Sequence, residues 1–199
     1  MGGAFLERDR PTGLGDSEDM KYTHLGRSGL SVSRLCLGTM NFGEQTVGSD
    51  AHRIMDAAHD YGINYFDTAN SYGDSLGPGA TEAIIGTWFA QGGQRRERTV
   101  LATKVYGDMS EWPNNNKLSA LNIRRALDAS LARLKTDYID IYQFHHVDRN
   151  TPWDEIWQAM ETASPSGADE ETDEGPDDEV EERPHRPIVR GGPIAIRGF

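Results

Sequence analysis

Short apolar runs alternate with amphipathic stretches over most of the chain. The runs at 33–39, 63–69, 99–105 and 138–145 have the length and composition of buried strands, and they recur at intervals of roughly 30 to 40 residues. Ahead of them, the segment "KYTHLGRSGLSVSR" consists of two short strand-like stretches around a Gly-containing turn. The pattern therefore predicts a β-hairpin followed by a series of βα units.

Four amphipathic helices are predicted between and after these strands. The first has Ser49 or Asp50 as its N-cap and ends at Gly62, and the second begins near Thr81 and ends at Gly92. Ser119 caps the third, and the segment "TPWDEIWQAMET" opens the fourth with a proline in its first turn. The residues predicted to face the core are Ile54, Ala57, Ala58 and Tyr61 in the first helix, Ile84, Ile85, Trp88 and Phe89 in the second, and Ile123, Leu127, Leu131 and Leu134 in the third.

Consecutive βα units predict the α/β class, with a parallel sheet covered by helices. Two architectures compete: a doubly wound sheet, and part of a (β/α)8 TIM barrel. A doubly wound dinucleotide-binding sheet carries a Gly-rich turn directly after its first strand, where this chain reads "GTMNFGEQ". The nearest alternative, "GPGATE" at 77–82, follows a loop. We therefore favour a partial (β/α)8 barrel of about four βα units.

Composition divides the chain into three segments. Residues 1–19 are polar and lack periodicity, which predicts a flexible leader and makes Met20 a candidate for the natural start. Residues 20–162 form the predicted half barrel. In the segment 163–199, ten of the 14 residues from Asp169 to Glu182 are Asp or Glu, so it cannot bury enough apolar area to offset its ordering entropy. We expect this segment to be a disordered acidic tail.

The formal net charge of −12 argues against nucleic acid and against an anionic membrane surface as partners. No apolar run approaches the ~18 residues of a membrane helix, and the N-terminus lacks the apolar stretch of a signal peptide. The single cysteine, Cys36, fits a reducing compartment, so the cytoplasm is the predicted location. The histidines have no metal-ligand spacing, and no metal is predicted.

Four titratable side chains follow the ends of the predicted strands: Asp67, Tyr72, Lys104 and His145. In a (β/α)8 barrel these ends converge at one face, where active sites lie. A nearby ammonium favours the ionised form of a phenol, an aspartate holds the ammonium, and a neutral histidine donates a hydrogen bond, a combination suited to reducing a carbonyl. Each residue alone also has an ordinary structural explanation as a turn, edge or capping group.

The segments "FDTANSYG", "LATKV" and "DYIDIYQFHHVDRNTPWDEIWQAM", together with the opening hairpin, resemble the aldo/keto reductase family from about Met20 to Thr162. The resemblance implies a (β/α)8 barrel that reduces a small aldehyde or ketone with NADPH. It implies that Tyr72 is the proton donor of a tetrad with Asp67, Lys104 and His145. His145 is preferred to His146 because it stands five residues after Asp140.

The resemblance further implies that Thr39, Met40 and Asp67 lie near the nicotinamide ribose. After Thr162 the chain departs from the family, whose later strands and loops hold the rest of the cofactor. We interpret that departure as the result of a frameshift, and we expect the chain as written to bind NADPH weakly and to be a poor reductase. Its open sheet edges favour self-association.

Two other functions stay open. A non-catalytic, truncated barrel module that binds a protein partner is the main alternative, and a tail that recruits a basic partner is a weaker one.

Overall fold

The structure is a computed structural model that describes residues 20–163 and 188–189. Strands β1 (Tyr22–His24) and β2 (Ser31–Ser33) pair antiparallel as the predicted hairpin. A separate four-stranded parallel sheet has the order β3-β4-β5-β7, with bounds β3 Cys36–Gly38, β4 Tyr65–Asp67, β5 Val100–Val105 and β7 Ile141–Phe144. Each neighbour in this order is also the next strand of the sheet along the chain, as in a barrel wall.

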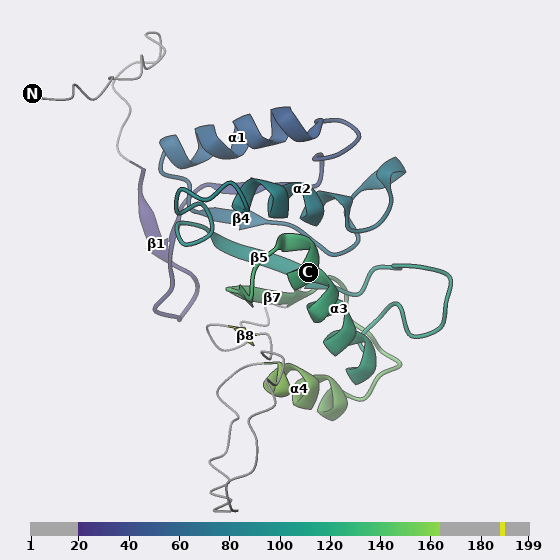
Figure 1. Ribbon diagram of the computed structural model, residues 1–199. Helices are drawn as coiled ribbons and strands as arrows, with labels where there is room; N and C mark the ends of the chain where they lie inside the picture. Colours follow the sequence, from purple (N-terminus) through teal and green to yellow (C-terminus); the bar gives the residue numbers. More distant parts are fainter. Residues whose placement is uncertain (1–19, 164–187, 190–199) are drawn as a thin grey trace, which may run out of the picture.

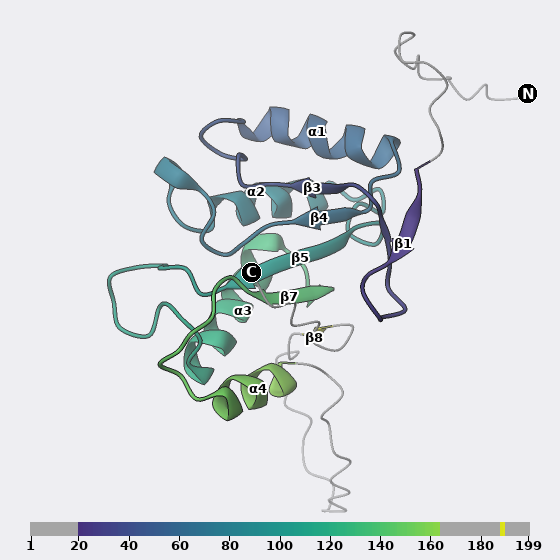
Figure 2. The same cartoon turned by 180° about the vertical axis from the view of Figure 1, so that it is seen from behind.

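One face of the sheet is covered by helices (Figures 1 and 2). Their bounds are α1 Gly48–Asp60, α2 Ala80–Phe89, α3 Ala120–Leu134 and α4 Trp153–Thr162, and a short 3-10 helix, η1, spans Asp74–Leu76. Figure 2 shows β3, β4, β5 and β7 in front of α2 and α3, with no labelled helix over the near face. This arrangement confirms the predicted fold class, a partial (β/α)8 barrel of four βα units preceded by a hairpin.

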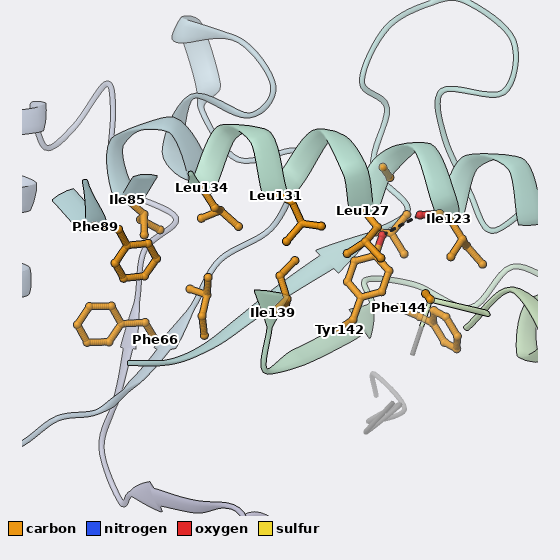
Figure 3. Packing of buried hydrophobic residues seen from close by; sticks show 14 of the residues in the cluster. Phe66, Ile85, Phe89, Ile123, Leu127, Leu131, Leu134, Ile139, Tyr142 and Phe144 are labelled. Atoms are coloured by element: carbon orange, nitrogen blue, oxygen red, sulfur yellow. Dashed lines mark hydrogen bonds between the residues drawn. The ribbon is translucent and has the colours of Figure 1, made fainter. Parts of the chain in front are cut away.

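The hydrophobic core lies between the sheet and its helices. Figure 3 shows Ile123, Leu127, Leu131 and Leu134 of α3 pointing toward the strands, where Tyr142 donates its hydroxyl to Ile123 O at 3.3 Å. Ser119 caps α3 by accepting from the Asn122 amide, as predicted. The inward face of α3 is therefore confirmed at all four positions.

The predicted inward face of α1 is wrong in part. Of the four predicted positions only Ala58 is buried, whereas Ile54, Ala57 and Tyr61 are exposed. The other buried residues of the helix are Ala51, Met55 and His59. Two overlapping sets of small and apolar residues compete in this helix, and packing favours the one centred on Met55, which is fully buried. The helix begins at Gly48, without a side-chain cap at Val47, so the predicted Ser49 or Asp50 cap is also wrong.

The predicted strand 138–145 is divided at Asp140. The carboxylate of Asp140 accepts the Leu101 amide at 2.9 Å and the Arg96 guanidinium at 2.8 Å, which ties this position to the beginning of β5. The strand β6 (Tyr138–Ile139), before this division, pairs in parallel with β8 (Ile188–Val189) and not with the main sheet. The pair Ile188–Val189 lies within the segment predicted as a tail, and the rest of that tail and the predicted leader lie outside the described residues.

No helix in the described part of the chain has the length and apolar character needed to cross a membrane.

Candidate active site

Lys104 is the centre of a polar cluster at the carboxyl ends of the strands. Its Nζ donates to Asp67 Oδ2 at 2.6 Å and to the Thr68 carbonyl at 2.8 Å. The two charged side chains are largely buried, with 13% of Lys104 and 29% of Asp67 exposed. They come from neighbouring strands and point to the face that carries no helix. An ion pair and a carbonyl therefore fix the ammonium in one place.

Tyr72 lies beside this ammonium. Lys104 Nζ is 5.1 Å from the centre of the Tyr72 ring. The backbone of Tyr72 is held at the start of α2, because its carbonyl accepts the amides of Gly79 at 3.1 Å and Thr81 at 3.3 Å. Gly73 next to it has a φ of 152°, and a Cβ there would overlap the Gly77 carbonyl oxygen. The loop that presents Tyr72 therefore requires glycine after the tyrosine.

His145 completes the group. Its ring meets the Tyr72 ring edge-on, with centroids 5.6 Å apart, and its amide extends β7 by donating to Val105 O at 2.9 Å. The pKa of His145 is lowered from 6.5 by burial first, then by the charges of Lys104 and His146, while Asp67 opposes the shift. The imidazole is therefore neutral at pH 7 and can donate a hydrogen bond without carrying charge.

The neighbouring His146 occupies a different position. Its ring stacks on that of His145 at 5.1 Å and meets Tyr106 edge-on at 5.1 Å. Tyr106 follows β5 and has a φ of 151°, a backbone conformation that non-glycine residues rarely adopt. The sequence did not single out Tyr106, since a tyrosine after a strand carries no pattern of its own. Of the two histidines, His145 is the one that contacts the Tyr72 ring.

The residues expected near a cofactor differ in what they are free to contact. Thr39 is fully buried, and its amide and hydroxyl both donate to Asp67 O, at 3.0 and 2.9 Å. Met40 beside it is 57% exposed. Thr39 thus fixes the end of β3 against the end of β4 and so helps to place Asp67, while Met40 offers an accessible surface.

The cluster combines an ammonium, a carboxylate, a phenol and a neutral imidazole at one edge of the sheet. Such a set can donate a proton from the phenol and stabilise the charge that develops when it leaves. Within the residues that the structure describes, no three His, Cys, Asp or Glu side chains gather as a metal site would need.

Comparison with known proteins assigns the family. Residues 34–168 match the model of the Aldo/keto reductase family. The chain is 62% identical over 152 residues to "Uncharacterized oxidoreductase YrpG" of Bacillus subtilis (strain 168), covering 74% of this chain and 47% of that protein. It is 44% identical over 142 residues to "Protein tas" of Escherichia coli (strain K12), covering 66% of this chain and 40% of that protein.

A plant protein is also similar. "Probable voltage-gated potassium channel subunit beta" of Arabidopsis thaliana is 37% identical over 142 residues, covering 71% of this chain and 42% of the relative. The chain spans about half the length of the curated relatives it matches. Because the family match extends over more than half of its residues, the chain belongs to the aldo/keto reductase family of oxidoreductases.

Proposed function

We propose that this chain carries the proton-donating site of an NADPH-dependent reductase that converts aldehydes or ketones to alcohols. The observation that supports it most directly is the position of Lys104. Its ammonium is bonded to Asp67 and lies over the Tyr72 ring, which in turn contacts His145. These side chains come from three strand ends and one loop, and they meet at the edge where barrel enzymes place their active sites.

Each residue has a distinct role in this proposal. Tyr72 donates its hydroxyl proton to the carbonyl oxygen, and the ammonium of Lys104 stabilises the phenolate that remains. Asp67 holds Lys104 charged and oriented. His145, kept neutral by burial and by the charge of Lys104, donates a hydrogen bond to the same carbonyl oxygen. Tyr72 then regains a proton from solvent.

The cofactor follows from the family. A reduced nicotinamide, when bound, supplies the hydride that the carbonyl carbon accepts. Thr39, Met40 and Asp67 would lie at its ribose. The side-chain chemistry fits: Asp67 engages Lys104 through Oδ2, and within the described part of the chain no bond is formed by Oδ1, which leaves an acceptor for a hydroxyl. The acidic chain and its exposed single thiol fit a cytoplasmic enzyme.

The test compares the 199-residue chain with its Tyr72→Phe variant. NADPH binding is measured by fluorescence titration, and carbonyl-dependent NADPH oxidation is measured by absorbance with aromatic aldehydes as substrates. Removing one hydroxyl leaves the ring and its packing in place, so the variant should bind NADPH as the parent does. Its turnover should fall by about 10² to 10⁴, the usual contribution of a positioned acid. A folded parent chain that neither binds nor oxidises NADPH contradicts the proposal for this chain.

A second candidate is a non-catalytic module that binds a protein partner. It is supported by the relative named as a probable potassium channel subunit. The same Tyr72→Phe variant separates the two functions, because a binding module keeps its partner affinity without the hydroxyl. If the parent shows no NADPH oxidation while a partner binds parent and variant equally, this second function replaces the first.

A further inference from the structure

A buried carboxylate lies behind the site, on the helix-covered face of the sheet. Glu82, in the first turn of α2, has none of its surface exposed. Its Oε2 accepts a hydrogen bond from Arg133 Nε of α3 at 2.8 Å, and Arg133 Nη2 lies 2.8 Å from the same oxygen as its ion-pair partner. Its Oε1 accepts the Thr103 hydroxyl of β5 at 2.6 Å. Both carboxylate oxygens are thus satisfied, which a charge in this position requires.

These contacts connect strand β5, which carries Lys104, to helix α2, whose start holds the Tyr72 backbone. Thr103 immediately precedes Lys104 on β5, so its bond to Glu82 fixes the strand that carries the ammonium. At the other end, Glu82 belongs to the helix whose first amides hold the Tyr72 carbonyl. Glu82 therefore links the backbone that presents Tyr72 to the backbone that presents Lys104.

Arg133 of α3 also contacts the start of α2. Its side chain lies against Gly79, where an added Cβ would come within 2.6 Å of Arg133 Cδ. Gly79 has a φ of 88° and precedes the first residue of α2, and its amide is one of the two that bind Tyr72 O. Arg133 thus packs against the start of α2 and forms an ion pair with Glu82 in the first turn of the same helix.

Stability alone is a weak reason for such a pair. A buried ion pair replaced by apolar residues of similar volume is often as stable or more stable, because both charges lose their hydration. Unlike apolar contacts, however, hydrogen bonds to Glu82 are directional and specify one position of α2 relative to β5.

We propose that Glu82 and Arg133 are a positioning pair, which sets the place of the Tyr72 ring relative to Lys104 and His145. The kinetic part of this inference rests on the proposed reductase function. The geometric part does not, because the Tyr72 ring contacts the His145 ring edge-on whether or not the chain reduces a carbonyl.

The experiment uses the 199-residue chain and a Glu82→Met/Arg133→Met double variant, which removes both charges while keeping side-chain volume. The readout is the pKa of the His145 ring, followed by NMR. If the Tyr72 ring loses its fixed place, His145 becomes more hydrated, and its pKa should rise toward 6.5 because burial is the main cause of its lowered value. The carbonyl KM should stay close to that of the parent, while kcat falls by up to about 100-fold.

A matched control is available at the other end of the strands. Arg96 is also a mostly buried arginine paired with a carboxylate, that of Asp140, at 2.8 Å. Its partners are located near the beginning of β5, away from Tyr72. Arg96→Met should lower the free energy of unfolding and leave the pKa of His145 unchanged.

Thr103→Val supplies a variant with the smallest change in shape, in case the double variant does not fold. It removes the link from Glu82 to β5 and should raise the pKa of His145 in the same direction. Arg133→Lys keeps the charge but should preserve the parent pKa of His145 only in part, because one ammonium cannot reproduce the hydrogen bonds that the planar guanidinium donates to Glu82 and Ser130.

The outcomes separate the two proposals. An unchanged pKa of His145 in the folded double variant and in Thr103→Val overturns the positioning role, as does an equal shift in Arg96→Met. If the parent lacks reductase activity but these pKa shifts appear, the reductase proposal fails and the positioning pair stands.

Discussion

Adjacent residues of β5 point to opposite faces of the sheet and differ in burial. Leu101 and Thr103 point to the helices and are fully buried, whereas Lys104 points to the face without helices and keeps part of its side chain exposed. Strand β4 repeats the contrast, with Phe66 fully buried and Asp67 partly exposed. Alternation along a strand thus assigns packing to one set of residues and chemistry to the other. The contrast can be tested one position at a time.

The largest effect is expected from Phe66→Ala on the covered face. Phe66 is fully buried and packs against the rings of His59 at 5.4 Å and Trp88 at 5.6 Å. Truncation leaves a cavity among these rings and should lower the free energy of unfolding by about 3 to 5 kcal/mol, measured by urea denaturation. This is a large share of the ~5 to 15 kcal/mol that holds a typical domain.

The adjacent residue on the other face is the control for that change. Asp67→Asn removes a charge from a largely buried pair but leaves an amide oxygen that can still accept from Lys104, so it should cost about 1 to 3 kcal/mol of stability, less than the cavity left by Phe66→Ala. If both substitutions destabilise the chain equally, the open face contributes to the core as much as the covered face does, and the contrast between the faces is lost.

A smaller effect on the covered face should depend on pH. His59 is 8% exposed, is hydrogen-bonded to Thr99 Oγ1 at 3.0 Å, and has a pKa lowered to about 4 by burial, and next by the charge of Arg98. An unfolded histidine binds its proton near pH 6.5, so between pH 6.5 and 4 the unfolded state holds more protons and stability rises with pH. Acidification from pH 7 to 5 should therefore remove about 2 kcal/mol through this group.

The measurement is the difference between the parent and a His59→Gln variant in urea denaturation at several pH values. Other groups titrate in both proteins, so the difference isolates His59. A parallel pH dependence of the two proteins would show that His59 takes up its proton in the folded state without cost.

The covered face also shows how far a sequence can predict packing. The inward residues of α3 were predicted because four aliphatic residues at helical spacing leave one choice of face. In α1 two overlapping sets of small and apolar residues are close in hydrophobicity, so the pattern does not decide which face is inward. Ile54 is predicted inward, but 40% of its surface is exposed. The strand 138–145 was predicted without its division, because the carboxylate of Asp140 finds its partners, Arg96 and Leu101, only in the folded chain.

The site was more predictable than the network behind it. Parallel strands bring their carboxyl ends together, so Asp67, Lys104 and His145 could be expected in one region from the strand positions alone, and the structure does place them there with Tyr72. Glu82 gave no such signal. A glutamate in the first turn of a helix is ordinarily exposed, and its burial depends on an arginine 51 residues later in the chain.

The smallest effects, with opposite signs, are expected on the open face. The charge of Lys104 lowers the pKa of His145, and that of Asp67 raises it. Lys104→Met removes the cation and leaves Asp67 unneutralised, and both changes favour the imidazolium, so the pKa of His145 should rise. Asp67→Asn removes the anion and leaves the ammonium unopposed, so the pKa should fall. NMR titration of the His145 ring, assigned with a His145→Asn variant, measures both shifts. Shifts of the same sign would mean that altered burial, the largest cause of the lowered pKa, outweighs the two charges, and that this face responds to packing as the covered face does.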